Sequence, residues 1–314
     1  MAEAGGAPSE PRRGLLLLLG TGLLWGTIGI AAKLIYRETT LDAVSVTWLR
    51  AAVAAPVCLA LGWSALGRDL FRAPRRDLAL MALLGAILIF YQWAYLAAID
   101  RIGVAPATLI ALCVPPALVA LASAVFFGET MDGRLALALT GALLGVAVLV
   151  GRPEAGASEP GATAAGVVLA LASATGLAAH VLVSRFLAGR HPTIRPLSVA
   201  FSVGMIVFAP VALGRGVAFA QPPVGWLLLV YLGVVPSALA YVMFQRGLRD
   251  VAATTASVLT LIEPLTAAIL AWLLFGERLS PLGFVGGALL LAAILLLSRR
   301  AVAERRLADE PAIV

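Results

Sequence analysis

The sequence predicts an all-α integral membrane protein whose ten transmembrane helices form two inverted five-helix repeats. Three observations support this prediction: an apolar composition, ten apolar runs of membrane-spanning length, and a copy of the first half within the second. Of the 314 residues, 61% are hydrophobic and 13% are charged, and the mean hydropathy is +0.99. A soluble domain carries about 25% charged residues, so the expected surroundings of this chain are the lipid bilayer.

The ten predicted spans follow one another along the chain. Each is close to the roughly 17–25 apolar residues that cross a bilayer as a helix, and the frequent Gly and Ala suit close helix packing in lipid. Short connections make neighbouring spans antiparallel. The spans cover about residues 14–36, 43–66, 78–99, 104–127, 134–151, 163–184, 196–213, 224–246, 252–275 and 282–298.

The basic residues predict the orientation of these spans. The N-terminal tail and the loops after even-numbered spans hold sixteen Lys and Arg residues, against five in the loops after odd-numbered spans. Since Lys and Arg accumulate in cytoplasmic loops, both termini are predicted to lie in the cytoplasm. This distribution accounts for the net charge of +6 without nucleic acid as a partner.

An internal repeat divides the chain. Arg101 and Glu129 recur 148 residues later as Arg249 and Glu277, and each glutamate ends a Phe-Gly-Glu run. With five spans in each copy, the second copy must be inverted relative to the first, an arrangement typical of secondary transporters that open alternately to either side. The predicted segments are a cytoplasmic N-terminal tail (1–13), a first repeat (14–151), an external linker (152–162), a second repeat (163–298) and a cytoplasmic C-terminal tail (299–314).

Glu263 is the most unusual polar residue, because of seventeen Asp and Glu it alone lies near the centre of a span. A charged carboxylate in lipid costs several kcal/mol, so Glu263 is expected to face a central cavity. There it would be a proton or cation site, or the partner of a substrate ammonium group. The alternative is a glutamic acid bonded to a neighbouring helix. Ser257 and Thr260 lie on roughly the same helical face, which predicts a polar lining.

Pro116 and its repeat counterpart Pro264 predict two helix breaks. A proline within a helix frees the carbonyl four residues earlier, here those of Leu112 and Thr260. Freed carbonyls at mid-membrane are tolerated where they meet water or other polar groups. The pair is therefore predicted to bend gate helices around the cavity, and static kinks are the alternative.

Polar and aromatic stripes supply the other candidates for the cavity wall. Aromatic rings with polar tips could hold a planar or apolar substrate, although tyrosines also form interfacial belts. These candidates are Trp25 and Lys33 in span 1, Tyr95 in span 3, Thr108 in span 4, His180 in span 6, and Ser237, Tyr241 and Gln245 in span 8.

Several of the charged residues have two interpretations. Lys33 is either the partner of a substrate carboxylate at the outer opening or a lysine that reaches the interface. His180 is either a group that titrates near neutral pH or one hydrogen-bonded between packed helices. For Arg50 a structural anchor is favoured, and Glu129 and Glu277 are expected to end helices and pair with loop arginines.

Several motifs resemble the EamA-type drug/metabolite transporter superfamily. They are Leu24-Trp25-Gly26-Thr27, Trp48-Leu49-Arg50-Ala51, Phe244-Gln245-Arg246-Gly247-Leu248-Arg249, Leu261-Ile262-Glu263-Pro264 and Leu274-Phe275-Gly276-Glu277. The resemblance implies ten helices, with spans 1–4 and 6–9 around a central cavity and spans 5 and 10 at the periphery. Members export amino acids and other metabolites or carry nucleotide sugars. In size and first-helix pattern, the chain looks most similar to bacterial aromatic amino-acid exporters of the YddG type.

The leading hypothesis is a secondary transporter of the bacterial inner membrane that exports small metabolites, with amino acids, aromatic ones included, as cargo and the proton as a candidate coupling ion. Nucleotide sugars, sugar phosphates and lipid flipping are alternatives within transport. A lipid-modifying membrane enzyme is the alternative outside it. The sequence holds no P-loop for ATP, no catalytic motif and no metal-ligand spacing, so no cofactor, metal or catalytic residue is predicted.

Overall fold

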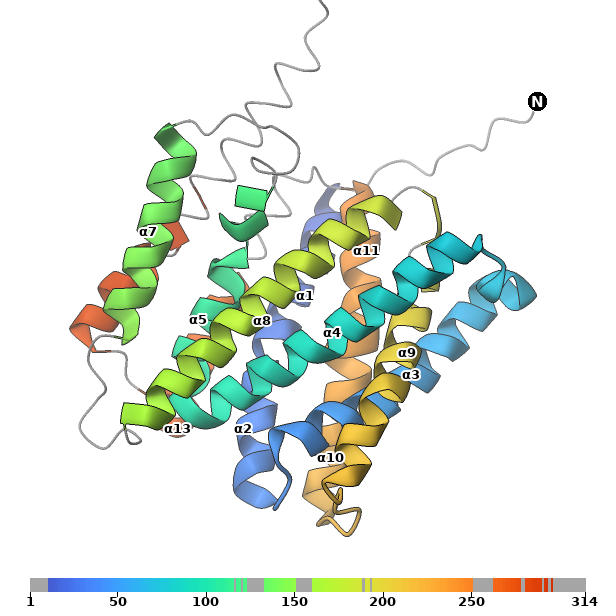
Figure 1. The fold of residues 1–314 in the computed structure, drawn as a ribbon, viewed down its shortest axis with the longest axis horizontal. Helices are drawn as coiled ribbons and strands as arrows, with labels where there is room; N and C mark the ends of the chain where they lie inside the picture. The colour runs from blue at the N-terminus through green and yellow to red at the C-terminus, as the bar shows by residue number, and fades with distance from the viewer. Residues whose placement is uncertain are drawn as a thin grey trace, which may run out of the picture.

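The computed structural model describes residues 11–115, 117–119, 121–122, 133–150, 160–187, 190–192, 194–250, 262–277, 280–289, 291–292 and 295. Within these residues every regular element is helical (Figure 1). Residues 281–289 are helical, and of the thirteen elements named next, eleven are α-helices, η1 is a 3₁₀-helix and η2 is a π-helix. They are α1 (Pro11–Gly26), α2 (Ile28–Glu38), α3 (Ala43–Leu66), η1 (Gly67–Phe71), α4 (Arg75–Ile102), α5 (Val104–Cys113), α7 (Gly133–Val150), α8 (Pro160–Leu187), α9 (Ile194–Gly214), α10 (Pro223–Leu232), η2 (Gly233–Leu239), α11 (Ala240–Asp250) and α13 (Ile262–Phe275).

The chain has the helices of an integral membrane protein. In the described part, six helical segments are long and apolar enough to cross a bilayer, and Val104–Val119 and Ile262–Phe275 are shorter apolar helices. Large apolar side chains such as Leu227 (69% exposed) and Val168 (65% exposed) cover the outside of the bundle, as lipid contact requires. The predicted spans 104–127, 252–275 and 282–298 extend beyond the described residues, so the count of ten stays a prediction.

Two predicted spans are interrupted. The first is divided at Thr27, whose hydroxyl donates to the Leu24 carbonyl oxygen at 2.6 Å and lies 2.6 Å from the Tyr231 hydroxyl. The eighth is divided by η2, which contains Pro236. A proline cannot donate its helical hydrogen bond, and π-helical turns are often found at functional sites.

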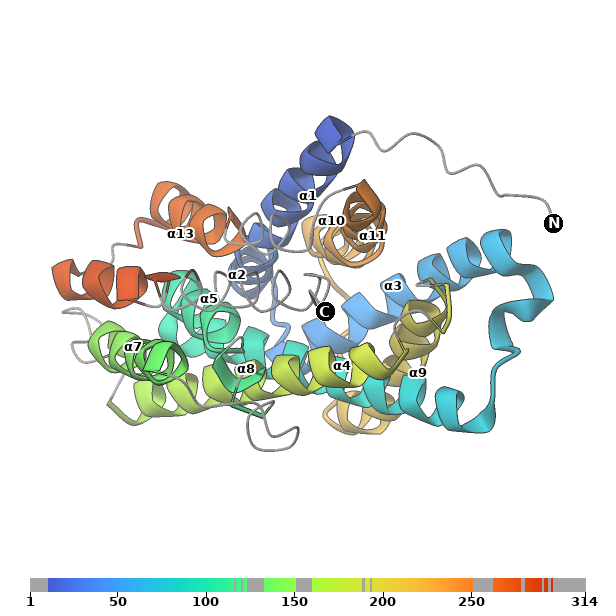
Figure 2. The ribbon, with the colours of Figure 1, turned by 90° about the horizontal axis from the view of Figure 1, so that it is seen from above.

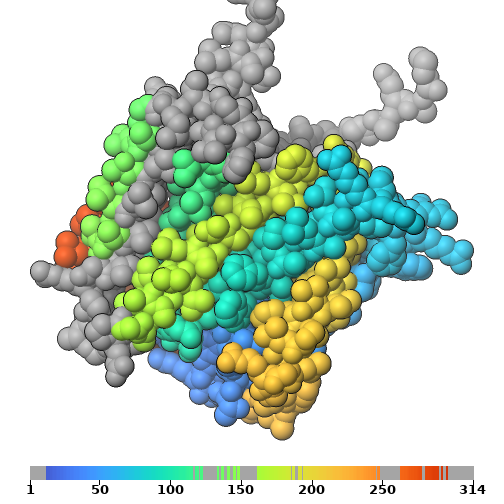
Figure 3. Space-filling model, viewed as in Figure 1, coloured from blue at the N-terminus to red at the C-terminus, as the bar shows by residue number. Residues whose placement is uncertain are grey.

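The helices form two layers around the centre of the bundle. Figure 2 shows α4 and α8 on one side and α1, α13, α10 and α11 on the other. Here α4 packs against α8 and α9, and α1 packs against α11 and α13. One face of the molecule is covered by α8, α4 and α9, which lie side by side (Figure 3).

Glycines allow the backbones of these layers to approach closely. A Cβ added to Gly85 of α4 would lie 2.4 Å from the Ala200 carbonyl oxygen of α9, and one on Gly176 of α8 would lie 2.7 Å from Tyr91 Cβ. Small residues at such crossings let membrane helices gain van der Waals contact. These contacts fix α4, which carries Tyr91, Gln92 and Tyr95, between α8 and α9.

Candidate functional site

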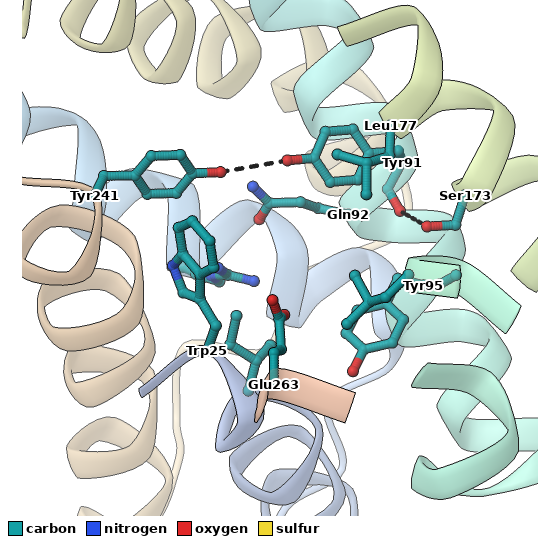
Figure 4. A pocket seen from close by; sticks show the side chains of 12 residues that line it. Trp25, Tyr91, Gln92, Tyr95, Ser173, Leu177, Tyr241 and Glu263 are labelled. Atoms are coloured by element: carbon teal, nitrogen blue, oxygen red, sulfur yellow. Dashed lines mark hydrogen bonds between the residues drawn. The ribbon is translucent and has the colours of Figure 1, made fainter. Parts of the chain in front are cut away.

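A cavity of about 140 Å³ lies where the two layers meet. Its wall draws on α1, α2, α3, α4, α5, α8, α11 and α13 and therefore on both predicted repeats (Figure 4). The lining residues are Trp25, Ile28, Arg50, Tyr91, Gln92, Tyr95, Ala111, Leu112, Ser173, Leu177, Tyr241 and Glu263.

Glu263 lies in the first turn of α13 with its carboxyl group directed into the cavity (Figure 4). The backbone of α1 passes close to this turn, since a Cβ on Gly26 would lie 2.9 Å from the Glu263 carbonyl oxygen. No described Lys, Arg or His forms an ion pair with Glu263. The cavity therefore contains a carboxyl group without a cationic partner in the described part of the protein.

Arg50 lines the cavity, although the sequence favoured a structural anchor at this position. Its side chain is buried, with 3% of the residue exposed, and its Nε–H donates to Ser237 Oγ at 2.9 Å. The Ser237 hydroxyl in turn donates to the Leu232 carbonyl oxygen at 2.7 Å. An arginine about two turns inside a predicted span, together with the serine predicted in span 8, was the signal available in the sequence. The pairing joins residues 187 apart in sequence, which no local pattern reveals.

Aromatic side chains form one wall of the cavity. The Trp25 ring packs edge to face on Tyr241, with 5.2 Å between ring centroids, and its Nε1–H donates to the Pro236 carbonyl oxygen at 3.0 Å. The Tyr91 and Tyr241 hydroxyls lie 3.5 Å apart (Figure 4). Trp25 and Tyr241, both predicted for the wall, are thus brought together, and η2 supplies the carbonyl that orients the indole.

The side of the cavity near α5 and α8 is also hydrogen-bonded. The Tyr95 and Thr108 hydroxyls lie 2.7 Å apart, and Thr108 is buried behind the wall rather than lining it. The Ser173 hydroxyl donates to the Tyr91 carbonyl oxygen at 2.9 Å. These bonds hold two wall tyrosines in place and leave the Tyr95 ring facing the cavity.

His180 packs behind the wall. Its ring lies 5.6 Å from the Tyr91 ring, and its buried Nδ1 has no hydrogen-bond partner among the described residues. Pro264 is buried in the first turn of α13. Other predicted residues, namely the Gln245 side chain, Pro116, Ser257, Thr260 and Glu129, lie outside the described part of the chain, so predictions for them stay predictions.

Lys33 lies away from the cavity, in a cluster around Glu277. This Glu277 cluster consists of Lys33, Val104, Ala105 and Glu277. The Lys33 ammonium pairs with the Glu277 carboxylate, which also accepts hydrogen bonds from the Val104 amide at 3.0 Å and the Ala105 amide at 3.2 Å. Glu277 thus caps α5, and its ionic partner is a helix lysine that the sequence did not suggest.

The surroundings of the Glu277 cluster make it a closed junction between α2, α5 and α13. Gly103 has φ +82°, a left-handed conformation that favours glycine, and it turns the chain so that the first amides of α5 face Glu277. The Phe275 ring lies under both Lys33 Nζ (4.9 Å) and Arg37 Cζ (4.7 Å). An anionic group at a helix N-terminus is favoured by the helix dipole, so these contacts reinforce each other.

Comparisons with known proteins agree with this architecture. The chain is 26% identical over 283 residues to the uncharacterized transporter YwfM of Bacillus subtilis, covering 90% of this chain and 93% of that protein. It is 30% identical over 264 residues to a probable terminal-alkyne amino-acid exporter of Streptantibioticus cattleyicolor, covering 82% and 84%. A crystal structure that is 21% identical superposes with a TM-score of 0.64 over 92% of this chain and 98% of its own, and it shows the fold alone.

The family assignment follows from a match that recurs in the chain. The EamA-like transporter family matches residues 12–151 and again residues 164–299. Another relative, 25% identical over 91% of this chain and 95% of its own, is the uncharacterized inner membrane transporter YicL of Salmonella typhimurium. These relatives are transporters and not enzymes, which removes the lipid-modifying enzyme as an alternative. The chain is therefore a membrane transporter that belongs to the EamA-like transporter family.

Proposed function

We propose that this transporter exports amino acids across a bacterial inner membrane, by exposing its central cavity alternately to the two sides. One observation carries the proposal: the cavity contains a guanidinium group and a carboxyl group, those of Arg50 and Glu263, and no described residue joins either of them in an ion pair. Buried charges are expensive unless they are paired. A cargo with both an anionic and a cationic group would supply the missing partners.

Alternating access requires the arrangement predicted from the sequence, with ten helices in inverted repeats at 14–151 and 163–298 and both termini in the cytoplasm. The double family match and the sharing of the cavity wall between the halves support it. In this arrangement the Glu277 cluster lies at the external end of the bundle. Glu263 would then be open to a coupling proton from whichever side the cavity faces.

Other cargo classes have less support. A phosphorylated sugar or nucleotide requires several cations, and Arg50 is the one Lys or Arg in the described cavity lining. The volume of about 140 Å³ is also below the roughly 300–1,000 Å³ of sites for drug-sized ligands. One relative is named a probable terminal-alkyne amino-acid exporter, which favours the same choice.

Counterflow in proteoliposomes tests the proposal. Vesicles preloaded with each of a panel of amino acids, nucleosides and sugar phosphates would be diluted into the same radiolabelled compound. We expect label to accumulate for amino acids and to stay at the level of protein-free vesicles for sugar phosphates. Accumulation of phosphorylated compounds alone would refute amino-acid export while leaving the family assignment intact.

A further inference from the structure

We infer that the cargo is a neutral α-amino acid that binds with its carboxylate at Arg50 and its ammonium group at Glu263. This inference deepens the proposed function and rests on it. The two residues, called the charged poles below, both line the cavity but make no ion pair with each other. A zwitterion placed between them would pair both.

Arg50 is arranged to bind a carboxylate. Ser237 accepts the Nε–H, and among the described residues no other acceptor meets the guanidinium. The terminal N–H groups are therefore available, and an arginine fork matches a carboxylate by two parallel hydrogen bonds. Ser237 is fixed in turn by its bond to the Leu232 carbonyl in the α10–η2 region. The anion-binding pole is thus held by the π-helical turn.

Glu263 is arranged to meet a cation. Its carboxyl group points toward the middle of the cavity, between Trp25 and Tyr95 (Figure 4). The tyrosines and Gln92 nearby supply neutral polar groups and no positive charge. An ammonium group carries three donors, so it can bind the carboxylate and one of these neutral acceptors together.

The rest of the cavity lining limits which side chain the cargo can carry. Besides the charged poles the wall includes Ile28, Ala111, Leu112 and Leu177, which offer no partner for a third charge. A charged side chain would therefore stay unpaired in a buried site. The volume of about 140 Å³ is below the roughly 300–1,000 Å³ of sites for drug-sized ligands and therefore suits a small cargo.

A ligand series on the unmodified protein tests the inference. Leucine would be compared with isoamylamine, which lacks the carboxylate, with isocaproate, which lacks the ammonium group, and with lysine and glutamate. Affinity would be read from ligand-dependent thermal stability and from competition with leucine counterflow. We expect leucine to bind at least about tenfold more tightly than each of the others. Equal affinity for leucine and either truncated analogue would overturn the inference.

Two substitutions test which charged pole binds the carboxylate of the cargo and which binds its ammonium group. In Arg50→Gln leucine should lose its advantage over isoamylamine, and in Glu263→Gln it should lose its advantage over isocaproate. Arg215→Gln and Glu38→Gln, exposed positions outside the cavity, are matched controls and should behave as wild type. Unchanged preferences in both cavity variants would reject the assignment.

Failure of the proposed function and failure of this inference would give different results. If no amino acid binds or is transported while another cargo is, the proposed function is wrong. If amino acids are transported but the analogues compete equally, the function stands and the charged poles do not recognise the zwitterion. If a cavity variant does not fold, the wild-type ligand series still decides.

Discussion

At the scale of single residues, the cavity receives a carboxyl group and a guanidinium group from two different helices, Glu263 from α13 and Arg50 from α3. A carboxylate at the centre of an apolar span has few structural explanations, so Glu263 stands out from the sequence alone. An arginine two turns inside a span also fits a membrane anchor, because long side chains reach the interface. What distinguishes Arg50 is its burial and its bond to Ser237 from a helix far along the chain, and both are properties of tertiary packing.

Ser237 positions Arg50, and Ser237→Ala should weaken the binding of cargo through the carboxylate. A hydrogen bond to a charged group contributes about 1.5–3 kcal/mol, so we expect KM for leucine to rise about tenfold or more with little change in kcat. Competition by isoamylamine should not change, because this compound does not use Arg50. The measurement is leucine counterflow in liposomes.

Ser64→Ala provides the control for this prediction, because Ser64 is exposed and bonds only locally to the Leu61 carbonyl oxygen. An equal loss of leucine and isoamylamine affinity in Ser237→Ala would mean that the serine acts on the whole cavity and not on Arg50.

At the scale of elements, hydropathy predicted most helices and missed their internal breaks. Apolar runs are set by bilayer thickness, so α3, α4, α8 and α9 lie where the sequence placed spans. The division of the first span at Thr27 accompanies contacts of the Thr27 hydroxyl with Leu24 and Tyr231. The pattern of apolar residues along the sequence does not predict such contacts. Pro236 lies within η2, whereas Pro56 and Pro210 lie within the α-helices α3 and α9, so a proline alone does not predict which helix changes its pitch.

The crossing of α4 and α9 should tolerate no added side chain. In Gly85→Ala the new methyl group would meet the Ala200 backbone at 2.4 Å, and backbone cannot move aside as a side-chain tip can. Overpacking of this kind costs about 1–3 kcal/mol. We expect a lower midpoint of thermal unfolding in detergent. Because α4 also carries Tyr91, a shift of this helix should move Tyr91 in the cavity wall and reduce leucine counterflow.

Gly214→Ala is the matched control, because nothing lies within 4 Å of a Cβ at that position. A Gly85→Ala protein as stable as Gly214→Ala would show that the backbones of α4 and α9 do not approach each other this closely.

At the scale of the whole molecule, the internal repeat predicted a cavity shared by the two halves, and its wall does draw on both. The repeat could not predict the Glu277 cluster, which joins α2 and α5 of the first half to the end of α13. That junction depends on the turn at Gly103 and on Lys33, which lies 244 residues from Glu277 in the sequence. The number of spans and their inversion stay predictions, since parts of both halves lie outside the described residues.

If the proposed topology holds, Glu277→Gln should open the external end of the transporter more often. The substitution keeps the shape of the side chain but removes the charge that holds Lys33 and caps α5. A loss of about 1.4 kcal/mol changes an equilibrium between two states tenfold. We therefore expect a cysteine placed in the cavity by Ser173→Cys to react about tenfold faster with an impermeant thiol reagent added outside.

This experiment requires a background in which the native cysteines Cys58 and Cys113 are replaced by alanine. Glu38→Gln, at the exposed last residue of α2, should leave the labelling rate unchanged. Unaltered labelling in Glu277→Gln would show that the Glu277 cluster does not hold that end shut.

The Lys33–Glu277 pair also makes the two halves of the carrier unequal. The repeat places Glu129 opposite Glu277, but the position 148 residues after Lys33 is Val181, which carries no charge. In the proposed topology this ionic bond holds the external side, and the repeat supplies no equivalent lysine for the cytoplasmic side. We therefore expect the empty carrier to rest with its cavity open toward the cytoplasm.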